Sequence, residues 1–139
     1  MPTIEDTIDG VTTRRRIHIT TAEIVALGAV TAGNIDLGVV LPIGAKMTRV
    51  RASNAGAIVT GLATLTVSVG DTAAPEEQLA AATVFASGAV AETDPVTPFA
   101  AQTATVSLIA RFTGDANLDT MTGAEGGFDI LLEWSEIGF

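Results

Sequence analysis

Two segments of this chain alternate apolar and polar residues with a period of two. They cover residues 104–112 and 128–134, and the pattern recurs in shorter segments at residues 17–22, 35–41, 46–53 and 63–69. Successive side chains of a β-strand point to opposite faces of a sheet, so this period predicts strands that are buried on one face. The alternation therefore constrains the chain to an all-β fold.

The number of such strands predicts how they are layered. About seven or eight short strands separated by turn residues predict an antiparallel two-sheet sandwich of jelly-roll or Greek-key type, with at most one short helix. The absence of a Cys–Trp–Cys pattern argues against an immunoglobulin-like sandwich. We expect its centre to contain the in-phase residues of the last two strands: Val106, Leu108, Ala110, Phe112, Phe128, Ile130, Leu132 and Trp134.

Two segments carry further local expectations. At residues 46–53, strict alternation places one set of side chains on one face, namely Met47, Arg49 and Arg51. Residues 75–82 begin with a proline followed by two glutamates, which favours a short helix, and an extended conformation through Phe85 is the alternative.

A chain of 139 residues is long enough for one domain with its own core. We assign residues 14–139 to a single β-sandwich domain, and residues 1–13, which are polar and acidic, to an N-terminal arm that is flexible or docked on a partner. The acidic N-terminus does not resemble a signal peptide. The most apolar stretch, residues 35–43, is too short to span a bilayer, so we expect no membrane contact.

The composition of the chain limits the classes of partner that it can bind. Charged residues make up 17 %, below the usual level of about a quarter, so part of the surface is neutral and suited to contacts within an oligomer or a larger assembly. The net charge of −9 disfavours nucleic-acid binding, which needs a basic surface. With no cysteine, the chain has no disulfide framework or thiol chemistry.

No motif in the sequence predicts catalysis, a cofactor or a metal. His18 is the single histidine and lies out of phase with Ile17 and Ile19, so we expect it on a solvated or partner-facing surface. The chain contains neither a Gly-x-Ser-x-Gly elbow nor a glycine-rich phosphate loop. We therefore expect no enzyme activity.

One loop has the spacing with which a calcium loop begins. Asp115, Asn117 and Asp119 stand at positions one, three and five, but Thr120 replaces the required glycine and Gly126 the bidentate glutamate. We expect a polar loop between two strands.

The run Arg14, Arg15 and Arg16 is the only basic cluster in the sequence. Its guanidinium groups are suited to forked hydrogen bonds with carboxylates on a partner, and Arg49 and Arg51 could extend the same patch. These five arginines are the candidate partner-binding residues. The alternative is a solvated strand whose arginines pair with acids of the same chain.

Three segments resemble the small β-sandwich virion proteins of tailed bacteriophages. They are residues 34–50 (NIDLGVVLPIGAKMTRV), residues 63–71 (ATLTVSVGD) and residues 118–134 (LDTMTGAEGGFDILLEW). The resemblance implies a decoration or cement protein that binds the major capsid protein or other virion subunits as a dimer or trimer. It further implies a location on the capsid surface after synthesis in the host cytoplasm. It assigns no individual residue.

Two other functions stay open from the sequence. One is a different phage structural component, such as a head–tail connector, a tail protein or a head-fibre protein. The other is a jelly-roll glycan-binding module. The chain has no tyrosine and one tryptophan, Trp134, which lies in phase with the core, and this disfavours the glycan module.

Overall fold

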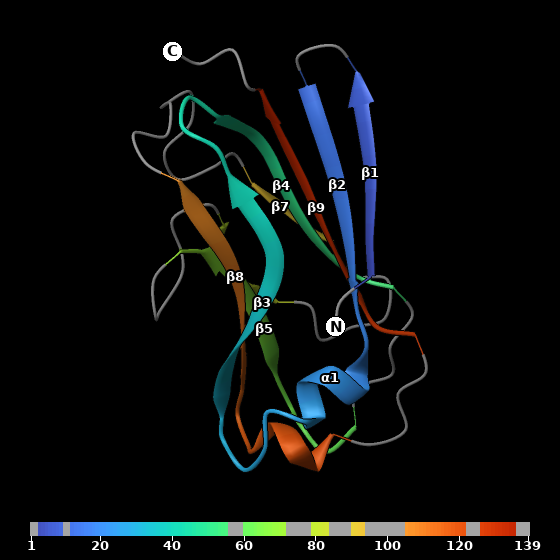
Figure 1. Ribbon diagram of the computed structural model, residues 1–139. Helices are drawn as coiled ribbons and strands as arrows, with labels where there is room; N and C mark the ends of the chain where they lie inside the picture. The colour runs from blue at the N-terminus through green and yellow to red at the C-terminus, as the bar shows by residue number, and fades with distance from the viewer. Residues whose placement is uncertain are drawn as a thin grey trace.

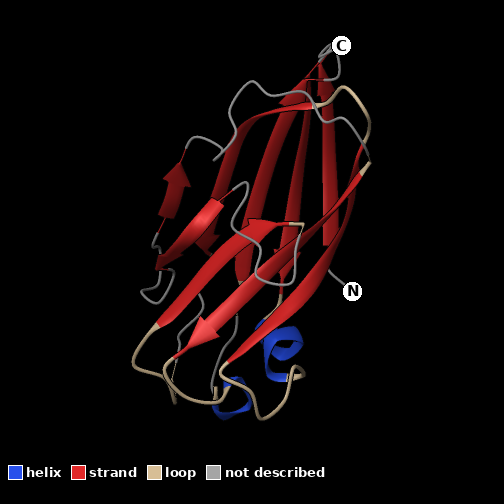
Figure 2. Cartoon of the chain, turned by 90° about the vertical axis from the view of Figure 1, so that its left-hand side faces the viewer, coloured by secondary structure: helices blue, strands red, loops and turns tan. Residues whose placement is uncertain are grey.

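The computed structural model of this chain describes residues 3–9, 12–55, 60–71, 79–83, 90–93, 105–121 and 126–135. These residues form nine strands in two antiparallel sheets that pack face to face (Figures 1 and 2). The five-stranded sheet contains β1 (Thr3–Asp9), β2 (Thr12–Ile19), β9 (Phe128–Ser135), β4 (Lys46–Asn54) and β7 (Val90–Thr93), in that order. The four-stranded sheet contains β3 (Ala32–Leu41), β8 (Val106–Gly114), β5 (Leu65–Gly70) and β6 (Leu79–Thr83). The predicted all-β sandwich is confirmed.

The strand pairing identifies the sandwich as a jelly roll. β5 pairs with β6, β4 with β7, β3 with β8 and β2 with β9, so each pair encloses the preceding one in the sequence. Consecutive pairs alternate between the two sheets. This is one long hairpin rolled into two layers, the jelly-roll arrangement. β1 lies outside this nested set, at the edge of the five-stranded sheet.

The core lies between the two sheets and contains the residues that the alternation predicts. Seven of the eight predicted centre residues are buried, and the eighth, Val106, is partly buried against them. Phe112 of β8 and Phe128 of β9 meet across the sandwich with their ring centroids 5.5 Å apart and their planes tilted by 58°. Burying each large apolar side chain contributes about 1.5–3 kcal/mol.

The short helix lies elsewhere in the chain than predicted. Residues 79–83 form strand β6, which confirms the extended alternative for them, and residues 75–78 lie outside the described part. Helix α1 (Thr21–Val25) instead ends the strand that we expected to continue to Ala22. Thr20 Oγ1 accepts a hydrogen bond from Glu23 N, and a Glu23 carboxylate oxygen accepts one from Thr20 N. This capping box satisfies amide groups that the first helical turn would otherwise leave unpaired.

Helix α1 and the 3-10 turn η1 (Leu118–Thr120) close one end of the sandwich (Figure 1). Each contributes a fully buried side chain, Ile24 from α1 and Leu118 from η1. Backbone hydrogen bonds from Leu118 N to Val30 O and from Asp119 N to Gly28 O join the two loops. No helix in the described ranges is long and apolar enough to cross a membrane.

The predicted face of Met47 is wrong. Met47 is buried, whereas Arg49 and Arg51 lie on the outer side of the sheet. The register with β9 shifts between Met47 and Arg49, so Thr48 is an extra residue in β4. Such a β-bulge inverts the alternation along a strand.

The N-terminal segment contributes to the five-stranded sheet. Strand β1 takes up most of the expected arm and pairs antiparallel with β2. Because β1 lies at the edge of the sheet, docking of residues 1–13 on a partner stays a prediction.

Candidate partner-binding face

The outer face of the five-stranded sheet carries five of the seven basic residues of this acidic chain: Arg14, Arg16, Lys46, Arg49 and Arg51. They belong to β2 and β4, which lie on either side of β9. Their side chains alternate with buried residues along each strand and therefore point away from the core. We call this surface the arginine face and define it by nine outward residues of the three strands: Arg14, Arg16, His18, Arg49, Arg51, Ser53, Asp129, Leu131 and Glu133.

The register of the strands arranges these residues in three rows. Opposite residues of paired strands share a face and lie side by side. One row is Arg14–Glu133–Arg49, the next is Arg16–Leu131–Arg51, and the third is His18–Asp129–Ser53. Each outer row thus has a carboxylate at its centre, whereas the middle row has an apolar side chain between two arginines.

Two carboxylates of β9 hold side chains of β2 in place. Arg14 Nε donates to Glu133 Oε2 at 3.1 Å, and Arg16 Nη2 donates to Asp129 Oδ2 at 2.7 Å. The other Asp129 oxygen, Oδ1, lies 2.7 Å from His18 Nδ1. Arg14 and Arg16 therefore pair with acids of the same chain, as the alternative interpretation of this cluster expects. Such exposed pairs contribute only about 0–1 kcal/mol each, but they fix the direction of the guanidinium groups.

The Asp129 carboxylate is held in its charged form. Its partial burial by itself raises the pKa, but the hydrogen bonds and positive charges of Arg16 and His18 outweigh this effect, so the pKa lies below its ordinary value of 3.8. Asp129 is thus ionised at neutral pH.

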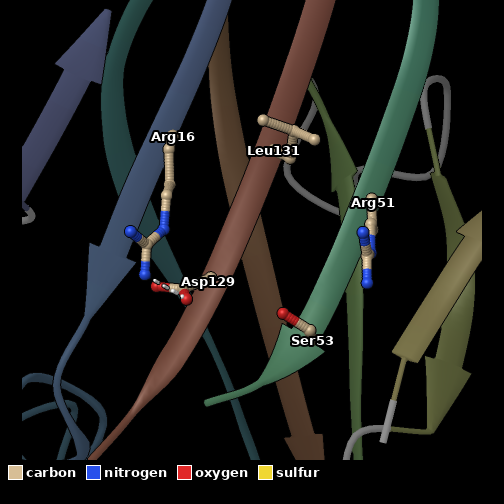
Figure 3. Close-up of a pocket in the computed structure, with 5 residues that line it drawn as sticks. All are labelled: Arg16, Arg51, Ser53, Asp129 and Leu131. Atoms are coloured by element: carbon tan, nitrogen blue, oxygen red, sulfur yellow. Dashed lines mark hydrogen bonds and ion pairs between the residues drawn. The ribbon is translucent and has the colours of Figure 1, made fainter.

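A shallow pocket of about 260 Å³ opens on this face (Figure 3). Arg16 and Arg51 stand on its two sides, across β9 from each other, and Leu131 lies between the two strands that carry them. Asp129 and Ser53 complete its lining. An apolar floor between guanidinium groups fits a side chain with an aliphatic stem and a carboxylate head.

The flanking strands place acidic residues beside both basic strands. Glu5 of β1 is the register partner of Arg16, and Glu92 of β7 is the register partner of Arg51. The sheet therefore alternates in charge from strand to strand, with β2 and β4 basic and their neighbours β1, β9 and β7 carrying acids.

Arg15 does not join the other predicted arginines. It lies on the opposite side of β2, in phase with buried Ile17, and its guanidinium carbon stands 5.6 Å from the centre of the Trp134 ring. This distance is typical of a cation–π contact. Four of the five candidate residues thus gather on one face. The sequence had also indicated that His18 lies on a solvated or partner-facing surface, but not that β9 separates β2 from β4.

The loop with calcium-like spacing has a different contact. Asp115 Oδ1 accepts hydrogen bonds from Ala63 N at 2.8 Å and Thr64 N at 3.0 Å. These backbone hydrogen bonds lower the Asp115 pKa and tie the loop to the segment before β5. Among the described residues, no group of three or more metal-ligating side chains comes together.

Trp134 is only 3 % exposed, so its ring offers no surface on which a sugar could stack. This burial disfavours the glycan-binding alternative as far as it relies on that tryptophan.

Comparison with known proteins shows the fold of the chain. A solved structure titled as the capsid of Ralstonia phage GP4 contains a chain that aligns with a TM-score of 0.57. The alignment covers 98 % of this chain and 90 % of that chain, at 22 % sequence identity. No family model and no curated protein matches the sequence. At this identity the likeness shows a shared fold.

Proposed function

We propose that this protein is a non-enzymatic structural protein of a phage virion that binds the capsid shell as a decoration or cement protein. The observation that carries the proposal is the structural likeness to a chain of a phage capsid structure, which extends over nearly the whole of both chains.

The arginine face supplies the contact surface in this proposal. Arg49 and Arg51, with Arg14 and Arg16, present guanidinium groups on strands, whose positions are fixed by the sheet. Carboxylates on the major capsid protein would bind between them, and the pocket above Leu131 would take one acidic side chain. Charged groups of this kind determine partner choice and association rate more than they add raw affinity.

A cement protein acts through repeated weak contacts. A dimer or trimer that bridges neighbouring capsid subunits gains avidity, because its second contact forms at a high effective concentration. We propose such a homo-oligomer at the virion surface, with the N-terminal residues 1–13 as a second contact to neighbouring subunits.

The copy number of the chain in purified virions tests the proposal. Quantitative mass spectrometry should find hundreds of copies per particle, whereas a head–tail connector, tail or head-fibre protein would give a dozen or fewer. Absence of the chain from the particle would refute every virion function.

A charge-reversal variant tests the contact surface. Arg16→Glu/Arg51→Glu should weaken binding to undecorated capsids by at least about tenfold, since each desolvated charge pair is worth roughly 1–2 kcal/mol or more. Arg111→Glu is the matched control, because Arg111 lies on β8 in the other sheet, with its Nη1 3.0 Å from Asn34 Oδ1. Equal binding by the two variants would remove the arginine face from the proposal.

A further inference from the structure

Strand β1 stands apart from the rest of the jelly roll. It lies outside the nested hairpin, at the edge of the five-stranded sheet (Figure 1). Among the described elements, β2 is the only one with which it makes extensive contact. Its attachment therefore depends almost wholly on one ladder of seven register pairs.

The two strands of this ladder carry opposite charges. β1 contains Glu5, Asp6 and Asp9 and no basic residue, while β2 contains Arg14, Arg15 and Arg16 and no acidic residue. The register places Glu5 opposite Arg16 and Asp6 opposite Arg15. Opposite charges on facing residues stabilise a strand pair, and like charges destabilise it.

This charge pattern selects what can pair with each sheet edge. A second β1 added to the open edge of β1 would bring acidic strands together, which is a common protection against edge-to-edge association. When β1 leaves, β2 becomes the edge of the sheet. This edge is basic and accepts an acidic strand. The same acidic strand is present in every other copy of the chain.

The connection between the strands is short enough to favour exchange. Only Gly10 and Val11 separate β1 from β2 in the sequence. A short hinge favours domain swapping, because straightening it sends the terminal strand away from its own molecule. The strand can then form the same register pairs with β2 of a second molecule.

We infer that β1 exchanges between copies, so that β1 of one molecule pairs with β2 of its neighbour. Closed and exchanged forms contain the same register pairs, and protein concentration decides between them. The inference draws on the proposed function only for the neighbouring copies, which a particle surface would hold at high local concentration.

Engineered cysteines test the exchange, because the natural chain contains none. Thr7 and Arg14 are register partners. We would mix the single variants Thr7→Cys and Arg14→Cys, unfold and refold them together at high concentration, and oxidise them. The matched control replaces Arg14→Cys with Thr48→Cys, an exposed position on β4, beyond β9.

Exchange predicts a disulfide-linked dimer in the Thr7→Cys and Arg14→Cys mixture, at least about tenfold more abundant than in the control and increasing with concentration. Equal dimer yields in the two mixtures would overturn the inference. The double variant Thr7→Cys/Arg14→Cys at high dilution verifies that this pair can form a disulfide within one molecule. If it cannot, the adjacent pair Asp6→Cys and Arg15→Cys takes its place in both mixtures.

The outcome is independent of particle binding, because the experiment uses the purified chain alone. A chain found in virions that shows no exchange would leave the decoration role standing and reject strand exchange. A chain that exchanges but is absent from virions would support strand exchange and reject the decoration role.

Discussion

Met47 and Arg49 stand two positions apart in β4 but lie on opposite faces of the sheet, Met47 in the core and Arg49 outside. The bulge at Thr48 separates them, and it brings Arg49 and Arg51 onto the same face as Arg14 and Arg16. If Thr48 occupied an ordinary position in the ladder instead of a bulge, the alternation would bring Met47 and the two arginines to the same face.

We predict that deleting Thr48 leaves a folded protein, because Met47, Arg49 and Val50 then alternate regularly without a bulge. The variant loses the hydrogen bond from Thr48 Oγ1 to Glu133 O and should be less stable by about 1 kcal/mol. Deleting Ala52 is the control, since it shifts the following residues to the wrong face and should abolish cooperative unfolding. Urea denaturation followed by circular dichroism distinguishes the two, and similar stabilities would contradict the bulge.

Asp129→Asn should remove the ion pair with Arg16 and alter the hydrogen bond with His18, and so lower the free energy of unfolding by about 0.5–1 kcal/mol at pH 7. The folded state holds the Asp129 pKa below 3.8, so the unfolded state takes up a proton first as the pH falls. The stabilisation is therefore fully present above about pH 5 and is lost as the pH falls through the lowered pKa.

Denaturation of the wild type and Asp129→Asn between pH 7 and pH 2 checks this prediction. The difference between their unfolding free energies should disappear at the acidic end of the series. Asp119→Asn, at an exposed position of η1, is a matched control for loss of a carboxylate. A difference that grows on acidification would contradict the assignment.

Gly61→Ala should destabilise the protein more than Gly28→Ala. Both glycines have positive φ angles, +90° for Gly61 and +93° for Gly28, so both variants incur a backbone penalty of about 1–2 kcal/mol. A Cβ on Gly61 would also overlap the carbonyl oxygen of Thr120, whereas a Cβ at Gly28 meets nothing within 4 Å. We expect an additional loss of about 1–3 kcal/mol for Gly61→Ala, measured by thermal unfolding. Equal losses of stability in the two variants would show that the loop of Gly61 does not contact Thr120.

Arg15→Ala should lower stability and leave partner binding unchanged. Its guanidinium group lies over the Trp134 ring, a contact worth about 0.5–1 kcal/mol at a partly exposed site. Arg16→Ala should have the opposite effects: it should weaken capsid binding and change the melting temperature little. A capsid-binding defect in Arg15→Ala as large as that of Arg16→Ala would place both residues at the interface.

The alternation in the sequence predicted the strands and the core well, because period two is a local property that needs no partner strand. The prediction failed at Thr48, where a bulge inverts the alternation and no residue type in the sequence marks the bulge. It also missed α1, although Thr20 and Glu23 have the spacing of a capping box. β1 was missed as a strand because most of its residues are polar or acidic.

The candidate site was predictable only in its parts. Arg14 and Arg16 are outward by their phase with Ile17, and the same argument separates Arg15 from them. That Arg51 lies across Leu131 from Arg16 depends on pairings between residues about a hundred positions apart. No local pattern determines such pairings.

Of the described strands, the one at the centre of the five-stranded sheet comes last in the sequence. β9 joins β2 to β4, so neither of these strands can take its final neighbours until residues 128–135 have left the ribosome. Pairings between such distant segments also make folding slow, since long loops must close before any contact is gained. The arginine face therefore forms only after β9 has paired with both β2 and β4.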